Sequence, residues 1–164
     1  MEFDRWQLMV TLISNDPAAT EAIGAEWGGA AVRGWVVGLS GDLGAGKTQL
    51  VKGIAKGLGI NSGVHSPTFS IINIYSGGRL SLFHLDLYRL ENPREIIAAG
   101  LEEYLEPDGV TVIEWAERWF GDFHSRAAMT PSNEKLIGGN PFRWAVIEHI
   151  SETQRRISYE DFGA

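Results

Sequence analysis

The sequence predicts one α/β domain in which helices cover both faces of a mixed, mostly parallel β-sheet. Short apolar runs typical of buried strands alternate with segments whose apolar residues recur at helical spacing. A glycine-rich turn joins one such run to the helix that follows it, as a βα unit requires. The chain of 164 residues is long enough for one well-buried core and short for two domains.

The N-terminal third is expected to hold two strand–helix pairs. Residues 5–13 (RWQLMVTLI) predict the first strand, and Pro17 suits the first position of a helix that continues to about Ala31. Residues 35–40 (WVVGLS) are apolar like a buried strand. The helix after the glycine-rich turn carries apolar residues on one face and is expected to end near Gly57 and Gly59.

The middle of the chain predicts a β-hairpin, two short helices and another buried strand. A turn at Gly77-Gly78 separates the two strands of the hairpin. The expected ranges are strands 70–75 and 79–86, a helix from Pro93, a helical turn at 101–105, and strand 110–113 ending on Glu114 and Trp115.

The pattern fades beyond Phe120. Residues 122–140 hold few apolar side chains, and we interpret them as a surface loop. Residues 142–150 and 155–159 predict two strands of a C-terminal β-hairpin, joined by residues 151–154. We therefore expect residues 1–164 to form a single domain.

The glycine-rich turn carries the complete pattern G-x-x-x-x-G-K-[ST], which binds nucleotide phosphates when it lies between a strand and a helix. Glycine permits positive φ angles, so the backbone N–H groups can curl around an anion, and the start of the helix adds a partial positive charge. The residues are Gly41, Asp42, Leu43, Gly44, Ala45, Gly46, Lys47 and Thr48. Lys47 is expected to reach the β- and γ-phosphates and Thr48 to ligate Mg²⁺, which predicts a three-layer P-loop NTPase-like domain that binds a nucleotide.

Two acidic residues close apolar runs and are candidates for catalysis. Asp86 ends LSLFHLD and Glu114 ends VTVIE. Ligands of open α/β sheets bind beyond the carboxyl ends of the strands, so both acids are expected near the phosphate loop. Hydrolysis needs acidic groups directed at the metal ion and the attacking water. We therefore predict Asp86 and Glu114, together with Lys47, as catalytic, and both acids as associated with Mg²⁺.

Composition limits the other functions. The chain has no cysteine, which excludes disulfides and thiolate metal sites and fits a cytoplasmic protein. Its N-terminus is not a signal peptide, and no apolar stretch reaches the roughly 20 residues that span a bilayer, so no membrane is expected. The net charge of −7 argues against direct binding of nucleic acid, which favours a basic surface.

The sequence also resembles the TsaE (YjeE) family, the small bacterial ATPases required for threonylcarbamoyladenosine modification of tRNA. The resemblance covers about residues 14 to 118. It rests on GDLGAGKT, SPTF, HLDLYRL, GLEEYL and VIEW, in this order and spacing.

The resemblance implies a role for each matching residue. Lys47 and Thr48 match the phosphate-binding lysine and magnesium-binding threonine, and Asp86 and Glu114 the acids near the metal ion. Further matches are Trp115 beside the nucleotide, Arg155 near the nucleotide, and a mobile switch segment made of Ser66, Pro67, Thr68 and Phe69. The resemblance further implies ATP and Mg²⁺ as cofactors, TsaB–TsaD-like partners, and contact with tRNA only through those partners.

Three residues depart from the family pattern. Ile74 and Ala116 differ from the residues usual there, and Gln49 stands where the family usually repeats threonine.

Other residues have two possible interpretations. His84 lies within a predicted strand and is interpreted as structural, with a catalytic role as the alternative. Tyr88 and Arg89 lie just past the Asp86 strand and could contact a partner or cap a helix.

Two other functions stay open at this point. A small P-loop kinase would need an acceptor site and a lid rich in arginine, and no such segment lies between Ser70 and Glu114. A nucleotide-dependent binding module with negligible turnover would use ATP only to set its affinity for a partner. A GTPase is disfavoured because the guanine-reading motif N-K-x-D is absent from the sequence.

Overall fold

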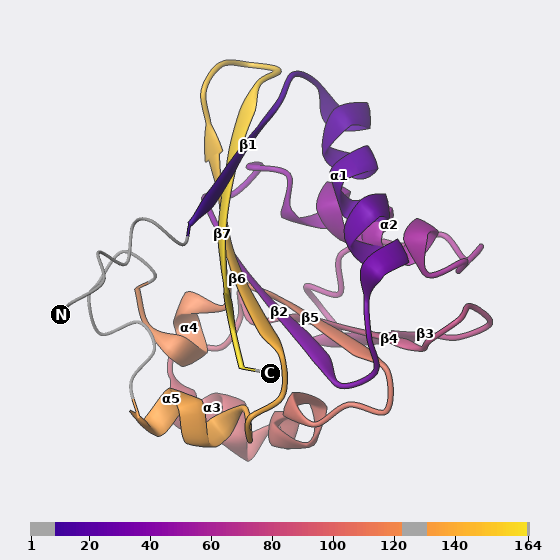
Figure 1. Ribbon diagram of the computed structural model, residues 1–164. Helices are drawn as coiled ribbons and strands as arrows, with labels where there is room; N and C mark the ends of the chain where they lie inside the picture. Colours follow the sequence, from indigo (N-terminus) through magenta and orange to yellow (C-terminus); the bar gives the residue numbers. More distant parts are fainter. Residues whose placement is uncertain (1–8, 123–130, 164) are drawn as a thin grey trace, which may run out of the picture.

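The computed structural model describes residues 9–122 and 131–163. Its elements, in chain order, are β1 (Val10–Ser14), α1 (Pro17–Ala30), β2 (Trp35–Ser40), α2 (Lys47–Gly57), β3 (Ile72–Tyr75), β4 (Leu82–Asp86), α3 (Pro93–Ala98), the 3-10 helix η2 (Leu101–Leu105), β5 (Val110–Glu114), α4 (Glu117–Phe120), α5 (Pro131–Leu136), β6 (Phe142–His149) and β7 (Arg155–Phe162). Figure 1 shows their arrangement.

All the strands of the described residues join one seven-stranded sheet, in the order β1-β7-β6-β2-β5-β4-β3. The central strands β6, β2, β5 and β4 run parallel to one another. Antiparallel pairing is confined to the edges, where β1 and β6 flank β7 and where β3 pairs with β4. The mixed, mostly parallel sheet and the C-terminal hairpin that the sequence predicted are thus confirmed.

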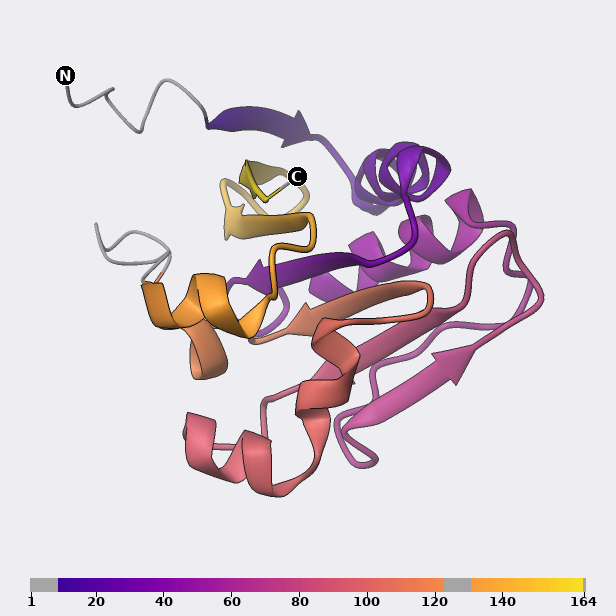
Figure 2. The ribbon, with the colours of Figure 1, turned by 60° about the horizontal axis from the view of Figure 1, so that its bottom comes forward.

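Helices cover both faces of this sheet (Figures 1 and 2). α1 and α2 lie on one face, and α3, η2, α4 and α5 lie toward the other. Residues of β2 alternate between two hydrophobic cores, with Val37 and Leu39 in the core under α1 and α2 and Val36 in the opposite core. This alternation follows from the two-residue period of a strand, and it confirms the predicted three layers.

Local sequence signals set the starts of two helices. Asp16 caps α1, its Oδ1 accepting a hydrogen bond from the Ala19 backbone N–H at 2.7 Å, and Pro17 follows. Asn92 caps α3 in the same way, accepting from the Glu95 N–H at 3.0 Å. Each cap satisfies a helix donor that has no partner within the helix.

Glycines on both helices bring α1 and α2 into backbone contact. A Cβ atom at Gly24 would lie 2.3 Å from the Leu50 carbonyl oxygen, and one at Gly28 would lie 2.2 Å from the Ile54 carbonyl oxygen. The two helices therefore approach more closely than alanine would permit. This contact positions α2, whose first residue is Lys47.

Several expected strand bounds are wrong. Among the described residues the first strand runs from Val10 to Ser14, one residue beyond the expected end, because Ser14 pairs with Arg155 of β7; residues 5–8 of the expected strand lie outside the described residues. β7 continues past the expected end at Tyr159 to Phe162. β3 begins later than expected, at Ile72, because the Ile71 N–H bonds the Pro67 carbonyl oxygen at 2.7 Å in a turn just before it. β4 begins later than expected, at Leu82, because the Arg79 N–H bonds the Leu58 carbonyl oxygen at 2.7 Å and ties the connection between the two strands to the end of α2.

The C-terminal quarter also differs from expectation. The interpretation of residues 122–140 as a surface loop is wrong for 131–136, which form α5. Ile137 after it is 2% exposed, and the Asn133 side-chain amide donates to the Phe120 carbonyl oxygen at 2.9 Å. So short a helix leaves little periodicity to detect, and residues 123–130 of the expected loop lie outside the described residues. The helix α4 was likewise not predicted.

In the described part of the chain, no helix combines the length and the apolar character needed to cross a membrane.

Candidate nucleotide-binding site

The predicted phosphate loop connects the end of β2 to the start of α2. Gly41, Gly44 and Gly46 have φ angles of 149°, 78° and 106°. A Cβ atom at Gly41 would also lie 2.4 Å from the Ile147 carbonyl oxygen of β6. Gly46 caps α2 without a side-chain hydrogen bond to the first turn. The loop therefore has the backbone conformation of an anion-binding turn, with a helix N-terminus behind it.

The Lys47 side chain lies within this loop. Its Nζ donates hydrogen bonds to the carbonyl oxygens of Gly41 at 2.5 Å and Asp42 at 2.9 Å, and the residue is 6% exposed. Burial lowers the pKa of Lys47 below its ordinary value, although Glu114, Glu117 and the two nearby aspartates oppose the shift. No carboxylate among the described residues forms an ion pair with its ammonium.

Thr48 and Glu114 meet as the sequence predicted. The Thr48 hydroxyl donates to Glu114 Oε1 at 2.7 Å. Glu114 ends β5, which lies beside β2 in parallel register, with Leu39 opposite Glu114. The carboxyl ends of the two strands thus place a hydroxyl and a carboxylate at one point beyond the sheet.

Asp86 lies at the corresponding end of β4, opposite Glu114 in the parallel register of β4 and β5. Its Oδ2 accepts hydrogen bonds from the hydroxyls of Ser66 at 2.7 Å and Thr68 at 2.9 Å. Its Oδ1 accepts from the Tyr88 backbone N–H at 2.9 Å. Asp86 therefore connects the predicted switch segment to the sheet.

The remaining residues of that segment reach outward. Phe69 is 83% exposed, and the Arg89 guanidinium lies 4.7 Å from the centre of its ring. The Ile71 N–H bonds the Pro67 carbonyl oxygen at 2.7 Å, closing a turn that contains Thr68 and Phe69. The sequence left two interpretations open for Arg89. In the structure its guanidinium contacts Phe69 of the switch segment.

Trp115 covers one side of Lys47. The ammonium lies 4.0 Å from the centre of the Trp115 ring, and the Tyr88 ring lies 5.1 Å from that ring, centre to centre. Trp115 has a φ angle of 60°, a left-handed conformation that costs a non-glycine residue about 1–3 kcal/mol. The contacts of the indole with Lys47 and Tyr88 offset this strain and keep the ring against the lysine.

Arg155 also lies at the loop. Its Nε donates to the Ala45 carbonyl oxygen at 2.9 Å, and its Nη1 donates to the carbonyl oxygens of Ser151, Glu152 and Gln154. The start of β7 is thereby fastened to the phosphate loop, so the structure places Arg155 beside the site that the resemblance implied.

Sequence reasoning missed Glu117 and Tyr88. Glu117 begins α4, contributes to the negative potential around Lys47, and has a buried Oε2 without a hydrogen bond among the described residues. Its place three residues after Glu114 was the only available signal. Tyr88 was interpreted only as a helix cap or a partner contact, because a ring that packs at a tilt against Trp115 leaves no trace in local spacing.

The donor set fits a nucleoside phosphate with Mg²⁺. Lys47 and the uncapped start of α2 offer positive charge to phosphate oxygens. Mg²⁺ is usually held by one or two protein oxygens together with phosphates and waters, and Thr48, Glu114 and Asp86 supply such oxygens. The described residues contain no group of three or more histidine, cysteine or acidic side chains that could hold a metal ion.

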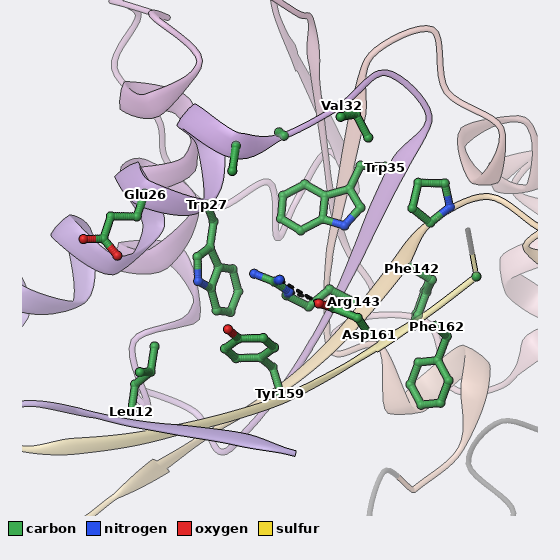
Figure 3. A pocket seen from close by; sticks show the side chains of 14 residues that line it. Leu12, Glu26, Trp27, Val32, Trp35, Phe142, Arg143, Tyr159, Asp161 and Phe162 are labelled. Atoms are coloured by element: carbon green, nitrogen blue, oxygen red, sulfur yellow. Dashed lines mark hydrogen bonds and ion pairs between the residues drawn. The ribbon is translucent and has the colours of Figure 1, made fainter. Parts of the chain in front are cut away.

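A cavity of about 440 Å³ lies near the other end of β2, away from the phosphate loop (Figure 3). Trp27, Trp35 and Tyr159 surround the Arg143 guanidinium, whose carbon lies 4.7, 5.2 and 4.0 Å from the three ring centres. Asp161 accepts from Arg143 Nε at 2.7 Å and Nη2 at 2.8 Å. The cavity is therefore built around a cation of the chain itself, and the sequence did not predict it.

Residues 14–136 match the model of the family described as threonylcarbamoyl adenosine biosynthesis protein TsaE. A tRNA threonylcarbamoyladenosine biosynthesis protein TsaE from a Nostoc species is 43% identical over 143 residues, covering 76% of this chain and 88% of that protein. The protein of the same name from Bacillus subtilis is 48% identical over 101 residues, covering 62% of this chain and 63% of its own.

The fold comparison agrees. The crystal structure of YdiB from Bacillus subtilis superimposes with a TM-score of 0.67 and 31% identity, covering 95% of this chain and 86% of that one.

Proposed function

This chain belongs to the TsaE family, and from that premise we propose that it binds and hydrolyses ATP with Mg²⁺ in the threonylcarbamoyladenosine modification of tRNA. TsaB–TsaD-like proteins are its proposed partners. It contacts tRNA only through them, in the cytoplasm.

One observation carries the proposal. Thr48, which follows the phosphate-loop lysine, donates its hydroxyl to Glu114 at the end of the neighbouring parallel strand, at 2.7 Å. Enzymes that hydrolyse nucleotides use this pairing, in which a loop hydroxyl and a strand-end carboxylate share the metal ion.

The chain's own residues divide the work. Lys47 exchanges two carbonyl hydrogen bonds for phosphate oxygens, and its charge stabilises the negative charge that develops in the transition state. Glu114 and Thr48 would hold the metal ion, which would supply neutralisation of the phosphate charge when bound. Asp86 orients the attacking water and exchanges its bonds with Ser66 and Thr68, so the switch segment responds to the γ-phosphate.

The surface around the site supports a protein partner. Leu43 is 74% exposed on the phosphate loop, and Phe69 is 83% exposed on the switch segment. Tyr88, whose ring packs at a tilt against Trp115, is 44% exposed. Exposed apolar side chains gathered around a site mark a surface that a partner covers. The net charge of −7 fits a subunit that leaves tRNA binding to its partners.

The decisive experiment measures steady-state ATP hydrolysis by the purified chain, alone and with TsaB–TsaD-like partners. We expect slow turnover alone and faster turnover in the complex, since within the recognised motifs Lys47 is the one basic residue placed at the phosphates. Fast turnover by the isolated chain that does not change on adding partners would contradict the partner-dependent part of the proposal. Phosphorylated acceptor in place of free phosphate would identify a kinase.

The two acids separate binding from hydrolysis. Asp86→Asn and Glu114→Gln keep size and remove charge, so both variants should retain substantial nucleotide binding and lose turnover. A variant that hydrolyses ATP at the wild-type rate with partners present removes its residue from the catalytic set. Single-turnover assays of the wild type distinguish slow hydrolysis from a binding module without turnover.

Hydrogen exchange tests the switch segment. Ser66 and Thr68 bond Asp86 beside the proposed γ-phosphate position, so their protection should differ between an ATP analogue and ADP. Identical protection of residues 66–69 in the two states would leave them an ordinary turn.

A further inference from the structure

A fully buried histidine lies beneath the acid pair, and neither the fold nor the proposed catalysis accounts for it so far. His84, in the centre of β4, is 0% exposed. Its Nε2 lies 3.3 Å from Glu114 Oε2, and neither ring nitrogen makes a directional hydrogen bond with the described residues. A buried polar group without a hydrogen-bond partner destabilises the folded state, so a histidine with a packing role alone is unfavourable at this position.

The sheet explains why the ring reaches Glu114 and not another residue. β4 and β5 are parallel, with His84 opposite Val112 and Asp86 opposite Glu114. Residues two apart on a strand share a face, so His84 lies on the face of Asp86, one diagonal step behind Glu114. The imidazole therefore approaches the glutamate from inside the protein, opposite the phosphate loop.

The two oxygens of Glu114 then have different neighbours. Oε1 accepts from the Thr48 hydroxyl at 2.7 Å, and Oε2 faces His84. Glu114 is itself 2% exposed, so bulk water does not hold its carboxylate. A carboxylate held from one side only can rotate about its terminal bond, whereas contacts on both oxygens specify one orientation.

We propose that His84 is a positioning residue, which donates its Nε2–H to Glu114 Oε2 and thereby directs Oε1 to Thr48 and the metal ion. This inference rests on the proposed function, because it gives Glu114 its metal-binding role. It follows the general pattern in which an outer hydrogen-bond partner orients a metal-binding side chain. His84 contacts neither nucleotide nor metal ion in this arrangement.

The first test needs only the wild-type protein. Nitrogen-15 NMR of the histidine ring reports which nitrogen carries the proton, and the proposal requires the proton on Nε2 with Nδ1 bare. Ring nitrogens of the Nδ1–H type at His84 would overturn the proposal without any variant being made.

The second test measures how far Mg²⁺ strengthens ADP binding, as the ratio of the dissociation constants in EDTA and in Mg²⁺. His84→Leu should lower this ratio about tenfold, toward that of Glu114→Gln, with ADP affinity in EDTA unchanged. Loss of an outer partner typically costs 10–100-fold in metal affinity. His84→Gln, whose amide can place an N–H near the position of Nε2, should restore most of the ratio.

The double variant His84→Leu/Glu114→Gln and the control Leu82→Ala separate positioning from packing. If His84 acts through Glu114, the double variant should lose no more than Glu114→Gln alone. Leu82 is also 0% exposed on β4, so Leu82→Ala should lower thermal stability and leave the ratio intact.

The outcomes separate the inference from the proposed function. An unchanged ratio in folded His84→Leu, or full additivity in the double variant, overturns the inference. Wild-type ADP binding that does not respond to Mg²⁺ overturns the proposed function instead.

Discussion

The two ends of β2 each hold a cation against tryptophan, but they satisfy it differently. At the Trp35 end, Arg143 is stacked among three aromatic rings and paired with both oxygens of Asp161. At the other end, Lys47 rests on Trp115 and two carbonyl oxygens, without an ion pair to the described residues. A cation that is already paired with a carboxylate, as Arg143 is with Asp161, can stabilise the fold but has little charge left for a ligand. A cation on neutral acceptors retains its charge for an anionic ligand.

The largest effect should come from Lys47→Met, which breaks the binding end alone. Loss of charge-assisted hydrogen bonds to phosphate should weaken ATP binding by about 3 kcal/mol, roughly 150-fold. The free energy of unfolding should stay the same or rise, because a buried charge is removed. Calorimetric titration with ATP and urea unfolding measure the two quantities. Wild-type affinity in this variant would reject the phosphate-loop assignment.

Gly28→Ala should disturb both ends, because α1 carries Trp27 of the aromatic cage and supports α2, where Lys47 begins. The added Cβ would meet the Ile54 carbonyl oxygen at 2.2 Å, and overpacking of backbone against backbone should cost about 2.5 kcal/mol of unfolding free energy. Gly29→Ala is the matched control in the same helix. A Cβ there meets nothing within 4 Å, so this variant should gain about 0.5–1 kcal/mol from helix propensity. Equal stability of the two variants would show that the helices can separate without cost.

Arg143→Met should break the other end alone. Arg143 contacts three rings and donates hydrogen bonds to Asp161, so the substitution should lower the free energy of unfolding by about 2 kcal/mol. Because Asp161 is 56% exposed, water can solvate the carboxylate left behind. ATP affinity should not change. Arg143→Lys keeps the charge but lacks the planar guanidinium, so it should recover only part of the lost stability. If urea unfolding showed Arg143→Met to be as stable as wild type, a structural role for Arg143 would be refuted.

The smallest effect is a pH dependence specific to Lys47. Burial holds its pKa below the value of 10.5 expected in the unfolded chain, so the unfolded state binds more protons in the alkaline range between the two values. Stability contributed by this residue therefore rises with pH across that window. From neutral to alkaline pH, the unfolding free energy of wild type should therefore rise relative to that of Lys47→Met. A difference independent of pH would show that the ammonium is not desolvated in the folded protein.

Much of the candidate site could be predicted from local sequence, and its supporting contacts could not. The phosphate loop is contiguous, and Asp86 and Glu114 close apolar runs, so position alone predicted their approach to the loop. His84 had the sequence features of any strand histidine. Its contact with Glu114 depends on the register of β4 and β5, which a single strand does not specify.

By itself, the sequence determined the glycine-rich turn, the capped starts of α1 and α3, and the alternation of strands and helices. These features depend on neighbours within a few residues, where backbone sterics and hydrogen bonds act directly. Only the tertiary structure decided that β6 lies beside β2 with β1 at the far edge, that α5 packs under Phe120, and that Arg143 is enclosed by rings from α1, β2 and β7. Those arrangements join residues far apart in the chain, and their stability comes from burial and pairing that exist only once the sheet has formed.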